Sequence, residues 1–306
     1  MSALGWWGVP IAILGGALRV STPFLFVSLG ECLTERSGRI NLGQEGILVM
    51  GAMSGYAASY LAGSATVGVL VAAACGILLG LLHGSLCSLP RVNDIAVGIA
   101  LMLFGTGLAF FLGKPYVQPQ APMLPSLSFG AWSSVPQVRA ALMVSPLFLI
   151  GVALTFFMSW AFANTRLGLI VRMVGDNSEA ARAMGYNPDR VRTLCTALGG
   201  GLSGVGGSFL SLYYPGSWSE GLSSGQGLIA VALVIFARWK PRNCLIAALF
   251  FGGAGALGPA LQSVGITSGY YLFNAVPYVL TLIILVWTSS RTRALAGAPG
   301  ELSIQR

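Results

Sequence analysis

Charge is scarce in this sequence. Only 8% of its 306 residues are Asp, Glu, Lys or Arg, whereas 55% are hydrophobic. A soluble domain usually carries about 25% charged residues, so charge this sparse cannot cover a globular surface of this size. We therefore predict an all-α polytopic protein whose surface faces lipid. Its apolar runs are long rather than alternating, which disfavours a β-barrel.

Patterns of catalytic and metal-binding residues are also missing. The chain has one histidine, and it contains no HExxH, GxSxG or GxxxxGK[ST] motif. Its five cysteines show no CxxC pair and lie in or beside apolar segments, as small packing residues do. We therefore expect no enzyme, no metal site and no ATP hydrolysis by this chain. The start, MSALGWWGVP, lacks a basic region and a cleavage site, so we expect no cleavable signal peptide.

Apolar runs of near-spanning length recur along the chain. Because a span needs about 20 residues, they predict eight or nine crossings. The first run is interrupted by Arg19 and Pro23, and the seventh is short. The 42 glycines fit closely packed transmembrane helices. The runs are 10–33, 42–61, 66–88, 95–112, 143–163, 192–213, 222–237, 243–262 and 273–290.

Basic residues are distributed unequally between the connections, and 14 of the 17 Lys and Arg lie in five of them. Those five are 34–39, 89–94, 166–192, 238–243 and the tail from Arg291. Cytoplasmic loops are enriched in Lys and Arg, so we assign these five to the cytoplasm. The basic balance is then a signal of topology and predicts no nucleic-acid partner. The opposite side holds Lys114 and Arg139, with the long connection 113–142, and Arg19 stays unassigned.

The connection 166–192 is polar and helix-forming, unlike its surroundings, and holds eight of the 26 charged residues. Asp176 with Glu179 three residues later predicts a capping box that starts a helix of about two turns. Gly185 suits its end, and Asn187 followed by Pro188 suits the start of the next helix. The short helix presents a small face, made of Ala180, Ala181 and Met184. Because two turns are unstable alone, we expect a partner to hold them, with an ordinary surface helix as the alternative.

Polar residues also stand at the starts of two apolar runs. Asn41, Gln44 and Glu45 open one, and Gln226 lies between two glycines at the start of another. A carboxylate at membrane depth is costly, so Glu45 should face protein or water. It either holds a loosened helix start or lines a solute path, because broken helices often line substrate cavities. Glu31 and Glu35 are predicted boundary residues.

Two further side chains have two interpretations each. Trp218, on the outer side with Tyr213 and Tyr214, is either an interfacial anchor or a stacking surface for an entering solute. His83 lies in an apolar run, where we predict a packed, hydrogen-bonded histidine rather than a ligand.

The stretch RMVGDNSEAARAMGYNPDRVR resembles the coupling segment of ABC-importer permeases of the ribose, nucleoside and branched-chain amino acid type, R-x-V-G-x-N-x-x-A-A-x-x-x-G-I. Tyr186 replaces the final aliphatic residue. The blocks SGRINLGQEG and GQGLIAVALVIFARWKP resemble two other signatures of nucleoside-importer permeases; Leu42, Gln44 and Ala237 depart from them. The G-I-D-L-S-V-G and G-G-T-S-L signatures of ribose-type permeases are absent, so the nucleoside branch fits better. The residues that match the coupling motif are Arg172, Val174, Gly175, Asn177, Ala180, Ala181 and Gly185.

This resemblance implies one permease domain, 1–306, of type II ABC-importer architecture, with a cytoplasmic coupling segment at about 172–190. Implied partners are cytoplasmic ATPase subunits that carry ATP and Mg, a related second permease chain rather than a second copy, and an extracytoplasmic substrate-binding lipoprotein. The implied location is the bacterial cytoplasmic membrane. The residues expected to couple to the ATPase are Gly175, Asp176, Asn177, Glu179, Ala180, Ala181, Arg182, Met184 and Gly185. Those expected along the translocation pathway are Asn41, Gln44, Glu45, Trp218 and Gln226.

The implied function is import of nucleosides or related small polar solutes by alternating access. The same importer type for a simple sugar such as ribose, or for branched-chain amino acids, is an alternative. An ATP-independent secondary transporter is more remote, because it needs ionisable residues for ion coupling and the spans offer few. A membrane scaffold would leave the polar, glycine-rich helix starts unexplained.

Overall fold

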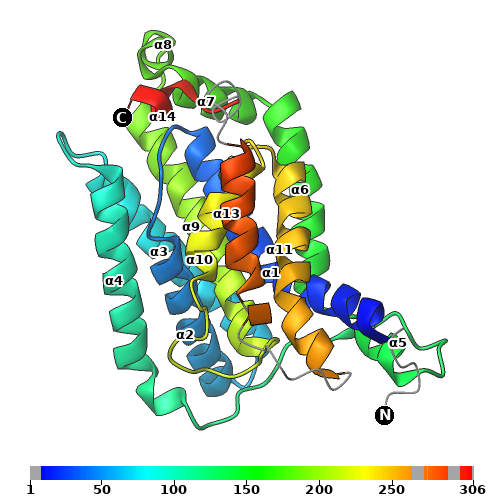
Figure 1. The fold of residues 1–306 in the computed structure, drawn as a ribbon. Coiled ribbons are helices and arrows are strands. Elements are labelled where there is room, and N and C mark those ends of the chain that lie inside the picture. Colours follow the sequence, from blue (N-terminus) through cyan, green and yellow to red (C-terminus); the bar gives the residue numbers. More distant parts are fainter. Residues whose placement is uncertain (1–7, 264–271, 274, 289–296, 305–306) are drawn as a thin grey trace.

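The computed structural model describes residues 8–263, 272–273, 275–288 and 297–304. Its elements follow the predicted order of apolar runs and polar connections (Figure 1). They are α1 (Gly8–Arg36), α2 (Gln44–Ala62), α3 (Ala65–Leu86), α4 (Asp94–Gly113), η2 (Lys114–Tyr116), β1 (Leu127–Ser128), α5 (Pro136–Ala141), β2 (Met143–Val144), α6 (Pro146–Asn164), α7 (Arg166–Asp176), α8 (Ser178–Ala183), α9 (Pro188–Leu212), α10 (Gln226–Phe236), α11 (Pro241–Ser263), α13 (Val276–Thr288) and α14 (Gly300–Ile304).

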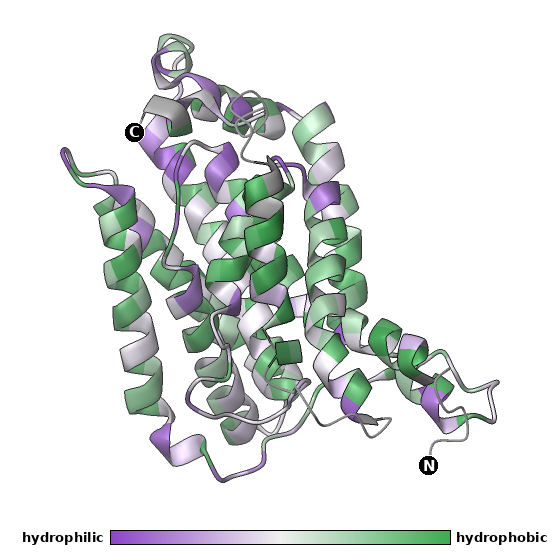
Figure 2. Ribbon diagram, viewed as in Figure 1, coloured by the Kyte–Doolittle hydropathy of each residue, from purple (hydrophilic) through white to green (hydrophobic). Residues whose placement is uncertain are grey.

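Five of the described helices are long and apolar enough to cross a membrane: α1, α3, α4, α6 and α11. The others are shorter or more polar, and α10 has only 11 residues. Hydrophobic residues follow the length of the bundle, whereas hydrophilic ones gather at the end where α7, α8 and α14 lie (Figure 2). The predicted helical, polytopic membrane class is therefore confirmed. Every predicted run contains a helix, although 289–290 of the last run lie outside the described residues, and the number of crossings stays a prediction.

The first apolar run forms one continuous helix of 29 residues with Pro23 inside it, so the residues that interrupt the apolar pattern do not break the helix. Arg19 also lies within this helix, and its guanidinium donates to the carbonyl oxygen of Ala140. Ala140 belongs to α5 in the connection 113–142. Arg19 therefore lies at the end of the bundle that carries this connection, opposite to α7 and α8.

The long connection 113–142 contains short elements of regular structure. It contains η2, β1 and α5, and β1 pairs with β2 in a two-stranded antiparallel ribbon. In this ribbon Leu127 is opposite Val144, and Ser128 is opposite Met143. β2 occupies the predicted start of the fifth run, so α6 begins at Pro146 instead of residue 143.

Glycine-rich α9 lies at the centre of the bundle and packs against α1, α2 and α3. A Cβ built at Gly199 would lie 2.5 Å from the Gly30 carbonyl oxygen of α1, and one at Gly207 would lie 2.1 Å from the Leu48 carbonyl oxygen of α2. Only a residue without a side chain permits backbones this close. The close helix packing predicted from glycine content is confirmed here.

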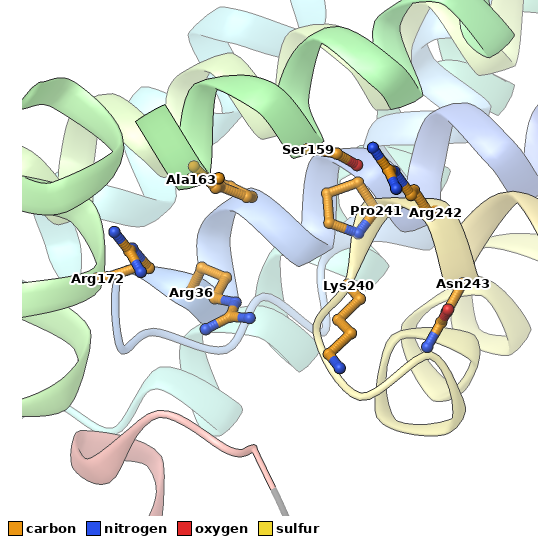
Figure 3. Close-up of a pocket in the computed structure, with 9 residues that line it drawn as sticks. Arg36, Ser159, Ala163, Arg172, Lys240, Pro241, Arg242 and Asn243 are labelled. Carbon is orange, nitrogen blue, oxygen red and sulfur yellow. The ribbon is translucent and has the colours of Figure 1, made fainter. Parts of the chain in front are cut away.

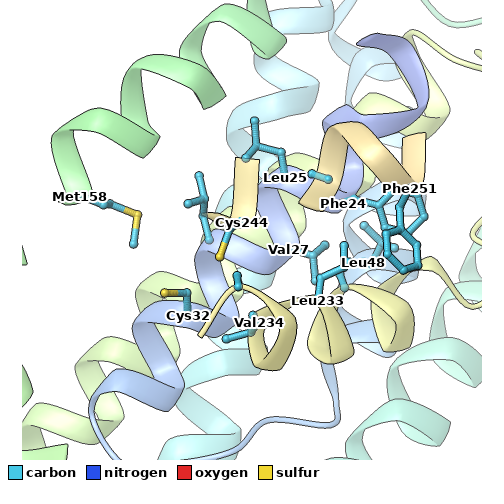
Figure 4. Packing of buried hydrophobic residues seen from close by; sticks show 14 of the residues in the cluster. Phe24, Leu25, Val27, Cys32, Leu48, Met158, Leu233, Val234, Cys244 and Phe251 are labelled. Atoms are coloured by element: carbon cyan, nitrogen blue, oxygen red, sulfur yellow. The ribbon is translucent and has the colours of Figure 1, made fainter. Parts of the chain in front are cut away.

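A hydrophobic cluster joins α1, α2, α6, α10 and α11 beside this centre (Figure 4). Phe24 of α1 and Phe251 of α11 are both buried, with ring centroids 6.4 Å apart. Leu233 and Val234 bring α10 into the same cluster. The short α10 is therefore held along its length by the core.

Candidate coupling and translocation site

Helix α8 is the predicted short helix, but its cap differs from the prediction. Asp176 is the last residue of α7, and Asn177 is the cap, because its Oδ1 accepts the Ala180 N–H at 3.0 Å. Glu179 therefore occupies the second helical position, one too early for a capping box. Its carboxylate pairs with Arg182 at 2.7 Å instead. Asp176 and Asn177 are both residues that can cap a helix, and Asn177 is the one that caps α8.

The end of α8 and the start of α9 agree with the prediction. Gly185 has φ +85°, the left-handed conformation that ends a helix most cheaply at glycine. Asn187 caps α9 by accepting the Arg190 N–H at 3.1 Å, and Pro188 occupies the first helical position.

The predicted small face of α8 is divided between two directions. Ala181 is fully buried, whereas Ala180 is exposed and Met184 is 71% exposed. Ala181 therefore anchors the helix to its own chain, which was not expected. The surface left free for a partner is formed by Ala180, Ala183 and Met184.

Segment 166–187, which contains α7 and α8 and is called the insert below, is fastened to the end of α1 and the start of α9. Gly175 lies so close to α1 that a Cβ there would be 2.1 Å from the Arg36 carbonyl oxygen. Arg192 of α9 donates through Nε to the Ser37 carbonyl oxygen at 3.1 Å and through Nη2 to the Val174 carbonyl oxygen at 3.4 Å. These contacts join the insert to segment 37–43, which leads into α2.

Glu301 of α14 holds the other side of the insert. Its Oε1 accepts the Ser178 N–H of α8 at 2.7 Å, and its Oε2 lies 3.1 Å from Arg192 Nη2. Burial by itself raises the pKa of Glu301, but the Ser178 and Arg192 contacts outweigh it and lower the pKa below the ordinary value of 4.5. No local pattern marks a glutamate near the end of the chain as a partner of residue 178, so sequence analysis missed it.

Glu301→Gln is expected to loosen the insert without unfolding the bundle. The substitution removes the ion pair to Arg192 and costs about 1–2 kcal/mol, a roughly tenfold increase in local opening. Hydrogen exchange of residues 177–184 measures it, and Glu179→Gln, which removes an exposed carboxylate of α8, should change exchange far less. Because the folded pKa is lowered, the stabilisation is present above pH 4.5 and is lost as pH falls through the folded pKa. Equal exchange in both variants would show that Glu301 does not hold α8.

A buried polar junction holds the start of α2. Glu31 of α1 accepts the Asn41 N–H at 2.8 Å and the Gln44 Nε2–H at 2.6 Å. Ser203 of α9 donates to Gln44 Oε1 at 2.5 Å. Glu31 is fully buried and Glu35 is 3% exposed, with its carboxylate accepting the indole N–H of Trp239. Protein therefore encloses both carboxylates, and their place at the membrane boundary stays a prediction. A carboxylate in the bundle is tolerated here because donors face both of its oxygens.

Glu45 joins the starts of α2 and α10. Its Oε1 accepts the Ser223 hydroxyl at 2.5 Å and the Gly225 N–H at 3.2 Å, and its Oε2 accepts the Gly227 N–H at 2.6 Å. The carboxylate thus satisfies the exposed donors of a helix N-terminus, where negative charge is favourable. Of the two roles predicted for Glu45, this geometry favours stabilisation of a helix start over lining of a solute path.

Four of the five predicted pathway residues therefore meet where α2 and α10 begin. Gln226 Oε1 and Asn41 Nδ2 are buried there without a hydrogen-bond partner among the described residues. Trp218 lies elsewhere: it is 1% exposed and donates its indole N–H to the Gly113 carbonyl oxygen at 3.0 Å. It packs the end of α4 and offers no surface to lipid or solute in this conformation. His83 is fully buried beside the Ile40 carbonyl oxygen at 3.2 Å, as expected for a packed histidine.

The bundle contains helices apolar enough to cross a membrane, two helices that start near buried polar side chains, and a short helix that projects from one end. These are features of a helical polytopic membrane protein. The chain belongs to the family described as "Branched-chain amino acid transport system / permease component", which matches residues 7–286. The family that the sequence resembles is thereby confirmed.

Relatives of known name agree on the transporter type. The chain is 31% identical to a "Putative glucose ABC transporter permease protein" of Haloferax volcanii, over 92% of this chain and 93% of the relative. It is 31% identical to a nucleoside ABC transporter permease protein of Lactococcus lactis, over 89% and 90%. It is 28% identical to a guanosine ABC transporter permease protein of Bacillus subtilis, over 92% and 93%. The chain is thus an ABC permease subunit and not an enzyme; ATP hydrolysis belongs to a partner chain.

Proposed function

We propose that this chain is a membrane-spanning subunit of an ATP-driven importer that moves nucleosides or related small polar solutes by alternating access. It crosses the bacterial cytoplasmic membrane eight or nine times. Its partners are cytoplasmic ATPase subunits that bind ATP and Mg, a related second permease chain and an extracytoplasmic substrate-binding lipoprotein. This chain itself binds no cofactor.

The observation that carries this proposal is α8. A helix of six residues stands beyond the bundle (Figure 1), capped by Asn177 and anchored through Ala181, with Ala180 and Met184 turned outward. Small residues on an exposed helical face suit insertion into a cleft of another protein. α8 is therefore the docking helix of the proposed ATPase contact, and residues 172–190 are its coupling segment.

The contacts beneath α8 support its role in transmission. α7 touches the end of α1, and Arg192 bonds segment 37–43, which leads to the junction at Glu31 and Gln44. One residue further on, Glu45 holds the start of α10. A displacement of the insert would thus be passed through directly bonded elements to both helix starts. There Asn41 Nδ2 and Gln226 Oε1 are buried without a hydrogen-bond partner among the described residues.

Nucleosides are the leading substrate class, because two of the relatives are named for nucleosides or guanosine. A simple sugar is the second candidate, because the Haloferax volcanii relative is named for glucose. Uptake of radiolabelled guanosine, uridine and glucose in cells with and without this chain separates them. Loss of nucleoside uptake alone, restored by the gene and sensitive to ATP depletion, supports the proposal. Loss of glucose uptake alone keeps the mechanism and changes the substrate.

Ala180→Glu tests the docking face directly. A large charged side chain at the centre of the interface weakens binding of the ATPase to α8 by about 2 kcal/mol or more. We therefore expect the rate of transport to fall roughly tenfold or more. Ala180 is exposed, so the stability of the permease itself should change by only about 0.5 kcal/mol. Ala180→Ser, which keeps the residue small, is the matched control and should transport normally. Full transport by a stably expressed Ala180→Glu variant would contradict the docking role.

A further inference from the structure

A basic pocket of about 400 Å³ opens at the end of the bundle that carries α7 and α8 (Figure 3). It lies where the last turn of α6, the end of α1, α7 and the start of α11 meet. Its four cationic side chains come from α1, from α7, from the first turn of α11 and from the residue directly before α11. The residues that line it are Arg36, Ser159, Phe162, Ala163, Arg172, Lys240, Pro241, Arg242 and Asn243.

No carboxylate lines this basic pocket, and none forms an ion pair with Arg36, Arg172, Lys240 or Arg242 in the part of the chain that the structure describes. Glu35, the chain neighbour of Arg36, directs its carboxylate to the Trp239 indole instead. The N-terminus of α11, which begins at Pro241, adds a partial positive charge. Among the described residues, the positive charge of the basic pocket is thus not balanced by a carboxylate.

A separate apolar groove of about 420 Å³ lies next to the basic pocket, and Asn243 lines both of them. It is lined along α11 by Ile246, Ala247 and Phe250, with Phe236 of α10 and Leu280 of α13 opposite. Ile246 and Phe250 are 54% and 69% exposed on a helix apolar enough to cross the membrane. A cationic pocket and an apolar groove therefore lie side by side at Asn243, on a helix apolar enough to cross the membrane.

We propose that the basic pocket binds the phosphate headgroup of an anionic phospholipid, with an acyl chain along the apolar groove of α11. Arginine and lysine are the residues that bind phosphate oxygens, and basic pockets between helices at the cytoplasmic surface suit anionic headgroups. A soluble phosphate would occupy only the basic pocket. An acidic protein segment would also occupy the basic pocket but would leave the apolar groove uncovered. A phospholipid fills both.

The bound lipid has a consequence for the insert. Arg172 belongs to α7, which leads directly to α8, whereas Arg242 belongs to the first turn of α11 and Lys240 directly precedes that helix. A headgroup between them ties the base of the coupling segment to a spanning helix.

The test is native mass spectrometry of the purified full chain, titrated with phosphatidylglycerol or with phosphatidylcholine of the same acyl chains. Lys240→Gln/Arg242→Gln removes two exposed cations of the basic pocket. Each cation near a lipid surface contributes about 1 kcal/mol, so the first phosphatidylglycerol should bind roughly 30-fold more weakly to this variant. Arg91→Gln/Arg190→Gln, which removes two exposed cations elsewhere at the same end, is the matched control and should bind as wild type does. Thermal unfolding verifies that both variants are folded.

Several outcomes overturn the proposal. Equal binding of phosphatidylcholine removes the charge requirement, and equal loss in both double variants shows that binding follows total charge rather than the basic pocket. Displacement of the lipid by inorganic phosphate at equal concentration assigns the basic pocket to a soluble anion. Unchanged phosphatidylglycerol binding in Lys240→Gln/Arg242→Gln places the lipid elsewhere. Selective loss in that variant, without competition by inorganic phosphate, confirms the lipid site.

Discussion

Gly204→Leu is expected to leave no folded protein after extraction from the membrane. A Cβ at Gly204 would lie 2.1 Å from the Ala72 carbonyl oxygen of α3, and on another side Gly51 of α2 approaches the Gly204 Cα. Both neighbours are backbone atoms, which cannot move aside as a flexible side chain does. The substitution therefore separates α9 from α3 and α2 at the centre of the bundle. Gly204→Ala, the smallest such change, should destabilise by about 2–3 kcal/mol.

The control for this prediction is Gly107→Ala in α4. A Cβ at Gly107 meets nothing within 4 Å, so the change adds a methyl group without a clash. Glycine in a helix costs up to about 1 kcal/mol relative to alanine, so this variant should be slightly more stable than wild type. Thermal unfolding in detergent, together with the monodisperse fraction on gel filtration, compares the three variants. If Gly204→Ala unfolds at the same temperature as Gly107→Ala, α9 is not the close-packed centre.

Local signals of the sequence predicted much of this fold. The apolar runs predicted the helices, and the glycine content predicted the close helix packing that is found at Gly199 and Gly207. The end of α8 at Gly185 and the start of α9 at Asn187 and Pro188 were also predictable, because cap residues act within one helical turn. Where two cap residues follow each other, as Asp176 and Asn177 do, the pattern leaves the start uncertain by one residue.

Contacts between distant residues could not be predicted in the same way. The sequence separation is 13 residues between Glu31 and Gln44, 182 between Glu45 and Gly227, and 123 between Glu301 and Ser178. The two longer contacts form only when the whole bundle folds. Nor does helical periodicity show which side of a six-residue helix is covered. Ala181 was therefore assigned to a free face, although the bundle buries it. The sequence shows that a carboxylate at position 45 is costly to bury, but only the folded structure shows the Ser223, Gly225 and Gly227 groups that donate to it.

Glu45→Leu is expected to detach the start of α10. The leucine accepts no hydrogen bond, so the Ser223 hydroxyl and the N–H groups of Gly225 and Gly227 lose their acceptor. Each unsatisfied buried donor costs about 1–3 kcal/mol, and three together rival the roughly 5–15 kcal/mol by which a domain is stable. Hydrogen exchange of residues 223–230 should rise to that of an open loop, and thermal unfolding should begin at markedly lower temperature. Glu220→Leu removes an exposed carboxylate from the same connection and should do neither.

Glu45→Gln keeps the size and shape of the side chain and changes only its hydrogen bonds. Its side-chain oxygen can stay with Ser223 and Gly225, but the amide group then opposes the Gly227 N–H, donor against donor. One bond of three is lost, so destabilisation should fall between wild type and Glu45→Leu, with the fastest exchange at Gly227 and its neighbours. Should the glutamine variant unfold like wild type, the carboxylate is not required to hold α10, and a role for Glu45 along the solute path gains support. Should it exchange fastest at Gly227, the carboxylate is what joins α2 to α10, and residues that contact solute must be sought beside it, at Asn41 and Gln226.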